Sequence, residues 1–144
     1  MNEVTPKLDA FTRAYIETAL WSSTDESTPN GGHPMDMDVP GVRRAYTMGD
    51  IDLETLFKMA EDCAKFQADN AADLEAGPLR YGPDFGPDGR AGHDFWLSRN
   101  GHGANYLDGD WPDEAAERLM KSARAFGEFN LYVGDDGRIH GVKG

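Results

Sequence analysis

Residues 52–78 read DLETLFKMAEDCAKFQADNAADLEAGP, and this stretch decides the expected fold because it carries the clearest periodicity in the chain. Asp50 or Asp52 can cap its start, and Gly77 followed by Pro78 is the usual order at the end of a helix. We expect one long helix here, roughly 35 Å in length at 1.5 Å per residue. The side chains that recur at helical spacing are Leu53, Leu56, Phe57, Ala60, Cys63, Ala64, Gln67, Ala71 and Leu74.

Two shorter stretches on either side show the same period. The first predicts a helix over about 8–20, with Thr5 and Pro6 at its start. The second predicts a helix over about 112–126, capped by Asp110 or Trp111 and closed by Gly127. The apolar positions of these two helices are Leu8, Phe11, Tyr15 and Ala19, and then Ala115, Leu119, Ala123 and Phe126.

Alternation of apolar and polar residues predicts strands elsewhere. Residues 93–100 indicate a strand, in which Phe95 and Leu97 face one side. Residues 129–142 indicate a hairpin around Asp135-Asp136-Gly137, with Val133 opposite Ile139. The predicted fold is therefore α+β: three helices packed on a small, about three-stranded antiparallel sheet, in the order α-α-β-α-β-β.

The length of 144 residues predicts a single domain over 1–144. A long segment at about 22–49 has no period, and we expect it to be mobile or to be an irregular excursion pinned by Val42, Tyr46 and Met48. Residues 77–91 are rich in glycine and proline and predict a loop.

The composition limits the classes of function. The net charge is −12, and a pI near 4.6 argues against direct binding to nucleic acid or to anionic lipid, because phosphate contacts need lysine and arginine. The start of the chain shows no secretion signal, and no apolar run predicts a membrane span. A lone Cys63 indicates a reducing cytoplasm. The acidic charge permits a basic protein as partner.

The placement of the acidic residues is more informative than any motif. Carboxylates crowd the C-terminal turns of the predicted helix over 52–77, where the helix dipole disfavours anions. They have the spacing of charges along a nucleic-acid strand, so we expect them to occupy a Lys/Arg groove of a partner, with solubility as the competing explanation. The expected partner-binding residues are Glu61, Asp62, Asp69, Asp73, Glu75, Asp36 and Asp38.

A polar cluster between residues 93 and 110 offers an alternative. His93, Asp94, His102 and Asp108 could bind a metal or pair a base with an orienting acid, although the spacing matches no zinc signature. The competing interpretation is that these are ordinary turn and surface residues. No cofactor is expected under the leading hypothesis.

A third hypothesis concerns large aromatic side chains. Trp96, Tyr106 and Trp111 could anchor a partner at an interface, and the competing interpretation assigns them to the core.

Four blocks of the sequence resemble, in the same order, a family of small acidic proteins encoded by tailed bacteriophages and prophages. The blocks are 19–27 (ALWSSTDES), 59–74 (MAEDCAKFQADNAADL), 91–111 (AGHDFWLSRNGHGANYLDGDW) and 132–139 (YVGDDGRI). The resemblance implies phage origin, expression in the cytoplasm of the infected bacterial host and an accessory role. It supplies no activity and no catalytic residue.

The charge pattern and the resemblance together lead to one functional expectation. We expect a non-enzymatic phage accessory protein that inhibits a basic, nucleic-acid-binding defence enzyme of the host, of the anti-CRISPR or antirestriction type, through a surface that mimics nucleic acid. The alternative is a small metal-dependent enzyme or metal-binding protein that uses the cluster at His93, Asp94, His102 and Asp108.

Overall fold

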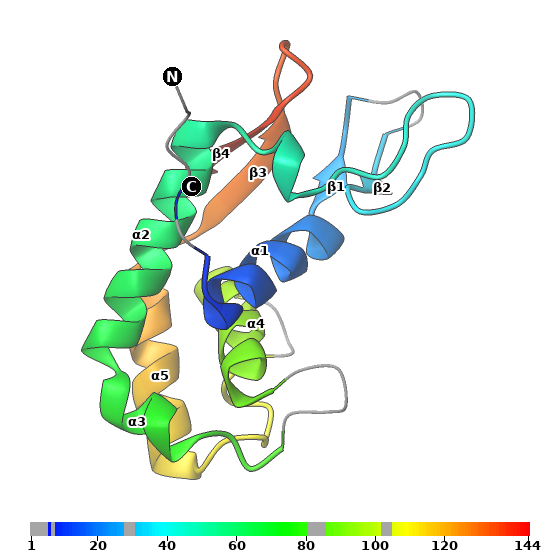
Figure 1. The fold of residues 1–144 in the computed structure, drawn as a ribbon. Helices are drawn as coiled ribbons and strands as arrows, with labels where there is room; N and C mark the ends of the chain where they lie inside the picture. The colour runs from blue at the N-terminus through cyan, green and yellow to red at the C-terminus, as the bar shows by residue number, and fades with distance from the viewer. Residues whose placement is uncertain (1–5, 7, 28–30, 81–85, 102–104) are drawn as a thin grey trace.

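The computed structural model describes residues 6, 8–27, 31–80, 86–101 and 105–144 (Figure 1). Within these ranges the fold is α+β, with five α-helices, one 3-10 turn and two separate two-stranded antiparallel sheets. The expectation of three helices on a three-stranded sheet is therefore wrong, because the predicted strand at 93–100 is helical and the predicted long helix is divided at Asn70. The elements are α1 Ala10–Ser22, β1 Thr24–Asp25, β2 His33–Pro34, η1 Met48–Asp50, α2 Leu53–Asp69, α3 Ala71–Ala76, α4 Pro87–Arg99, α5 Asp113–Ala125, β3 Phe129–Val133 and β4 Ile139–Lys143.

The predicted strand at 93–100 is a helix, α4, and the predicted loop at 77–91 ends where α4 begins at Pro87. Every residue from Ala91 to Arg99 is buried. A helix enclosed on all sides needs no amphipathic stripe, so its sequence lacks the helical period and its chance alternation imitates a strand.

The predicted long helix is broken at Asn70 into α2 and α3. The Asn70 side chain is buried and donates from Nδ2 to the Phe66 carbonyl at 2.9 Å and to the Ser122 hydroxyl at 2.8 Å. A side chain that binds the backbone of the preceding turn competes with the helical ladder, and here it also ties the break to α5. Gly77, with φ of 80°, ends α3 as its position after the last periodic residue predicts.

The C-terminal hairpin has the predicted register, with Val133 opposite Ile139 and Tyr132 opposite His140. The outer edge of β4 is held against the segment before α2, where Asp52 donates its backbone N–H to the Ile139 carbonyl at 2.8 Å. The hairpin therefore lies against the N-terminal half of α2 and not against a third strand.

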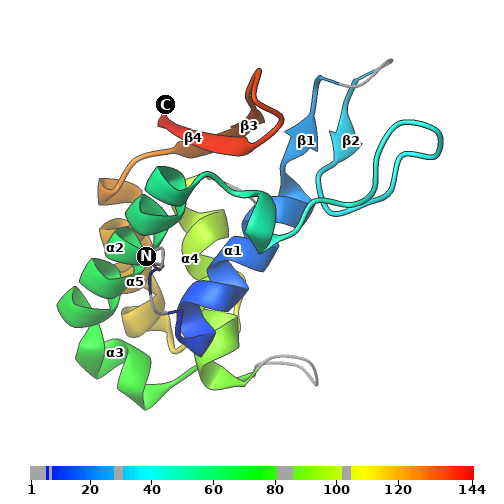
Figure 2. The same cartoon turned by 45° about the horizontal axis from the view of Figure 1, so that its top comes forward.

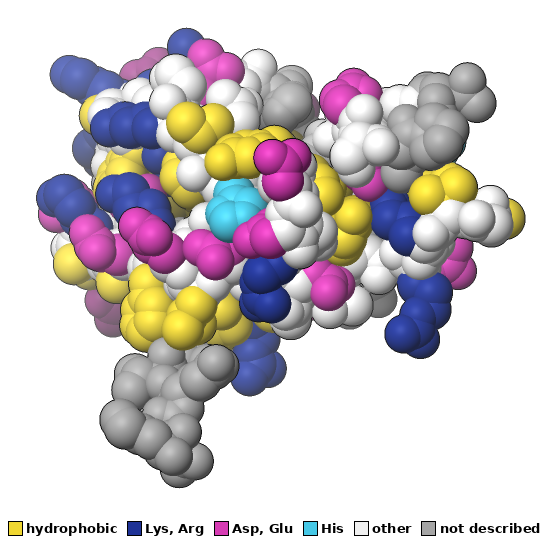
Figure 3. All heavy atoms as spheres, turned by 90° about the horizontal axis from the view of Figure 1, so that it is seen from above, with side chains coloured by type: hydrophobic (Ala, Val, Ile, Leu, Met, Phe, Trp, Pro, Cys, Tyr) yellow, Lys and Arg dark blue, Asp and Glu magenta, His cyan; other side chains and the backbone are white. Residues whose placement is uncertain are grey.

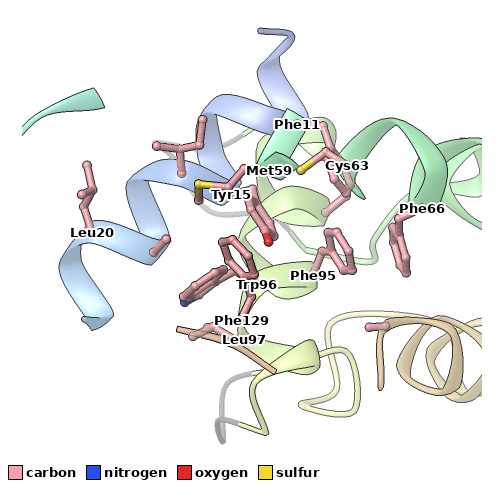
Figure 4. Packing of buried hydrophobic residues seen from close by; sticks show 14 of the residues in the cluster. Phe11, Tyr15, Leu20, Met59, Cys63, Phe66, Phe95, Trp96, Leu97 and Phe129 are labelled. Atoms are coloured by element: carbon pink, nitrogen blue, oxygen red, sulfur yellow. The ribbon is translucent and has the colours of Figure 1, made fainter. Parts of the chain in front are cut away.

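Aromatic rings from several elements form the centre of the core (Figure 4). Phe66 of α2 and Phe95 of α4 stack with their ring centroids 4.1 Å apart, and Tyr15 of α1 lies 5.2 Å from Phe95. Helix α4 approaches α1 so closely that a Cβ atom on Gly92 would lie 2.0 Å from the Phe11 carbonyl oxygen. Glycine is therefore the residue that allows these two helices to pack.

The segment at 22–49 contains short elements that extend away from the helices as an arm (Figures 1 and 2). Met35 is buried in the core and Val39 is buried within the segment, and Arg43 donates from Nε to Asp25 Oδ2 at 2.8 Å. Tyr46 and Met48 pack against the core as expected, but Val42 is 50% exposed and anchors nothing in the described part of the chain. The ion pair between Arg43 and Asp25 therefore holds this segment in place of Val42, which we expected to pin it.

Candidate functional site

The seven carboxylates expected to bind a partner do not form one surface. Five of them lie on α2 and α3, while Asp36 and Asp38 lie on the arm. Figures 1 and 2 both show α3 and the arm at opposite ends of the molecule. A single continuous strip of all seven charges is therefore absent from the described structure.

Asp62 is part of the interior. Its carboxylate accepts from Arg99 Nη1 at 2.9 Å and lies 3.1 Å from Lys58 Nζ, and its side chain is 8% exposed. Arg99 also donates to the Tyr15 hydroxyl at 2.9 Å and to the Gly127 carbonyl at 2.8 Å. This carboxylate neutralises a buried guanidinium and is not available to a partner.

Two of the carboxylates near the end of the predicted long helix, Asp69 and Asp73, have bases beside them. Asp69 pairs with Lys65 of the same helix at 2.9 Å. Asp73 receives two hydrogen bonds from Arg118 of α5, at 2.9 and 2.7 Å, and these bonds lower the pKa of Asp73. Fold stability alone accounts for both residues.

Three of the expected residues remain exposed without an ion pair among the described side chains: Glu61, Glu75 and Asp36. Asp38 is exposed and accepts a hydrogen bond from the backbone N–H of Ala45 at 2.7 Å. Of these four, Asp38 borders a hollow with Asp50 and the cation Arg44, and Glu61 borders one with Asp52 and Glu54.

The alternative cluster is divided in the structure. His93 and Asp94 are adjacent and buried, with His93 Nδ1 2.8 Å from Asp94 Oδ1, and Asp94 also accepts from Trp111 Nε1 at 2.8 Å and from Arg90 Nε at 3.2 Å. Asp108 is exposed, and His102 lies outside the described residues. Among the residues that the structure describes, no group of three or more His, Cys, Asp or Glu side chains is arranged to hold a metal ion.

The aromatic residues proposed as anchors belong to the core. Trp96, Tyr106 and Trp111 are each no more than 2% exposed, and the Tyr106 hydroxyl donates to the Ala91 carbonyl at 2.7 Å. Among the residues that the structure describes, the aromatic side chains exposed to solvent are instead Trp21, Phe57 and Tyr132.

Two of these exposed rings line a groove between the start of α2 and the hairpin, which we call the hairpin groove. It has a volume of about 500 Å³. Figure 3 views the molecule from above Figure 1 and shows a row of Asp and Glu side chains crossing this face beside a histidine. The residues that line the groove are Asp52, Glu54, Thr55, Phe57, Lys58, Glu61, Phe129, Tyr132, His140 and Gly141.

The hairpin groove combines negative charge with aromatic faces. Asp52, Glu54 and Glu61 supply three carboxylates, and Phe57 and Tyr132 are 40% and 49% exposed. His140 stacks on Tyr132 with a centroid distance of 5.7 Å and contacts Asp136 at 3.0 Å. Carboxylates next to aromatic rings bind guanidinium and ammonium groups through ion pairs and cation–π contacts.

The sequence interpretation missed this groove. Phe57 keeps the helical spacing of the core residues and was therefore assigned inward. Tyr132 offered a usable signal, because the alternation in the hairpin places Phe129 and Leu131 inward and Tyr132 outward, as the structure has them. That these two exposed rings lie in one groove depends on how the hairpin packs on α2.

Comparisons with known proteins add no assignment: no family model, curated protein or solved structure matches this chain. None of the described helices is long and apolar enough to cross a bilayer.

Proposed function

We propose that this chain is a non-enzymatic binding protein whose hairpin groove takes up a basic segment of a partner protein. The observation that carries the proposal is the meeting of three carboxylates and two exposed aromatic rings in one hollow. Lys58 is the one lysine on its border, and its ammonium group is already paired with Asp62 at 3.1 Å. The charge excess of the groove is therefore negative.

The proposed binding surface differs from the one expected from the sequence, but the expected kind of partner, a basic protein, is the same. A net charge of −12 attracts basic proteins at long range, and a groove of this chemistry fits arginine or lysine side chains at short range. With the resemblance to phage proteins, the favoured partner is a nucleic-acid-binding defence enzyme of a bacterial host, which the chain inhibits by occupying basic residues that otherwise contact nucleic acid. Solubility remains the competing account of the charge.

The first experiment measures binding of a fluorescent arginine-rich peptide by anisotropy, with a citrulline peptide of equal length as the neutral control. We expect the arginine peptide to bind and the citrulline peptide not to bind, and we expect added salt to weaken binding. The variant Glu54→Gln/Phe57→Ala should bind roughly tenfold more weakly, since it removes one charge and one ring.

The matched control is Glu114→Gln/Glu117→Gln, which removes two exposed charges from α5, away from the groove. If both variants lost affinity equally, the binding would reflect net charge alone and the groove assignment would be overturned. Inhibition is tested separately, by adding the chain to DNA-cleavage reactions of purified restriction and CRISPR nucleases. Unimpaired cleavage in all of them would contradict the inhibitory role while leaving the peptide result standing.

A further inference from the structure

A second hollow, of about 370 Å³, lies farther along α2, where α5 and the end of β4 meet it; we call it the lysine groove. It is lined by Lys58, Glu61, Asp62, Lys65, Asp69, Arg99, Ser122, Ala125, Phe126 and Lys143. The described chain contains four lysines, and three of them border this one hollow. Such a gathering is unexpected in a protein of net charge −12.

The positive charges of the lysine groove exceed what its own carboxylates neutralise. Asp62 alone serves two cations, Lys58 at 3.1 Å and Arg99 at 2.9 Å. Asp69 neutralises Lys65, and Lys143 has no ion pair within the described residues. Only Glu61, at the rim shared with the hairpin groove, opposes the two charges that remain.

The rest of the lining is suited to an apolar group. Phe126 and Ala125 form part of the wall, and the Ser122 hydroxyl lies beside them. The guanidinium of Arg99 is held in place by Tyr15, Asp62 and the carbonyl of Gly127, so the positive base of the groove is preorganised.

We infer that the lysine groove is a binding site for a small phosphate monoester that carries an apolar or aromatic group. The four cations of the lining exceed its three carboxylates by one charge, which favours an anion, and the three terminal oxygen atoms of a phosphate monoester can accept from more ammonium groups at once than the two of a carboxylate. Lysine ammonium groups bind phosphate as point charges, and the apolar group of the ligand packs on Phe126. This inference does not rest on the proposed function: the two hollows share Lys58 and Glu61 at their rims, but the ligand inferred here has the opposite charge.

The test uses amide chemical shifts of the labelled protein during titration with phenyl phosphate, inorganic phosphate and phenol. We expect phenyl phosphate to give saturable shifts around Ser122, Phe126 and Lys143. Inorganic phosphate should bind several-fold more weakly, and phenol should give no saturable shift at the same concentrations. Equal affinity for the two phosphates would overturn the assignment of Phe126, and saturable binding of phenol would overturn the assignment of an anion site.

The variants Lys58→Gln and Lys143→Gln should each weaken phenyl phosphate binding about threefold, and the double variant about tenfold. Lys121→Gln is the matched control, because Lys121 is the one described lysine outside the groove and is exposed on α5. Its affinity should equal that of the unmodified chain. An equal loss in Lys121→Gln, or full affinity in the double variant, would overturn the inference. Unchanged thermal unfolding of Lys143→Gln excludes loss of folding as the cause.

Discussion

Arg99 Nη1 lies 2.9 Å from Asp62 Oδ2, and this ion pair joins α4 to α2 where the two side chains are 1% and 8% exposed. Asp62 is one of the carboxylates that the sequence assigned to a partner. Its role in the structure is to neutralise the most deeply buried cation of the described chain. Part of the surface acidity that remains lies next to the hairpin, where Asp52, Glu54 and Glu61 line the hairpin groove.

Replacing Arg99 should destabilise the fold strongly. Arg99→Leu leaves Asp62 and the Tyr15 hydroxyl without their buried partner, and breaking a buried ion pair from one side costs about 3–5 kcal/mol. We expect a loss near the lower end, since Lys58 still reaches Asp62. The measurement is urea unfolding followed by circular dichroism. Arg13→Leu, an exposed position on α1, serves as control and should stay within about 0.5 kcal/mol.

Adding one methyl group to α4 should test the close packing against α1. In Gly92→Ala the new Cβ would lie 2.0 Å from the Phe11 carbonyl oxygen, so the helices must separate. We expect a loss of about 3 kcal/mol or more in the free energy of unfolding, or no folded protein. Gly86→Ala, whose Cβ would have no described neighbour within 4 Å, should unfold like the unmodified chain. Equal stability of the two variants would contradict the packing of α4 on α1.

The pair between Asp73 and Arg118 predicts a contribution to acid stability. The hydrogen bonds from Arg118 lower the pKa of Asp73 below its usual value of 3.8. A lowered pKa in the folded state stabilises the fold above the pKa of the unfolded chain, and this stabilisation disappears as the pH falls through the folded pKa. The difference in unfolding free energy between the unmodified chain and Asp73→Asn should therefore be constant near neutral pH and shrink below about pH 4.

The measurement for Asp73 is urea unfolding of both proteins from pH 7 down to pH 2.5. The same experiment on Glu75→Gln is the control, since Glu75 is exposed in the same helix and has no ion pair in the described structure. A pH-independent difference for Asp73→Asn would show that Arg118 does not hold the carboxylate in solution.

Cys63 should be unreactive in the folded protein. Burial raises the pKa of its thiol well above 9.0, and only the thiolate attacks a disulfide reagent. We expect labelling by Ellman's reagent to be slower than in urea by roughly a thousandfold or more, because the site must open first. In the background Cys63→Ala, the variant Ala68→Cys places a thiol at an exposed position of the same helix and should react rapidly. Rapid labelling of Cys63 in the unmodified chain would contradict its burial.

The sequence alone determined the elements in which one face is buried and the other is exposed to solvent. Helices α1, α2 and α5 and the β3–β4 hairpin were predicted because such elements carry a period of 3.6 or of 2 that can be read locally. The break at Asn70 escaped prediction, because the hydrogen bonds of its side chain to the Phe66 carbonyl and to Ser122 of α5 cannot be read from the helical period.

Tertiary structure alone decided what the buried polar residues do. Helix α4 is enclosed by the rest of the chain, so its sequence carries no period, and the apparent alternation at 93–100 had no structural meaning. Likewise the charge of a carboxylate is visible in the sequence, but its partner is not. Arg118 lies 45 residues from Asp73 and Arg99 lies 37 residues from Asp62, and only the packing of the helices brings each pair within hydrogen-bonding distance. Charge alone therefore identified an acidic protein, and the fold selected which acids remain free to bind.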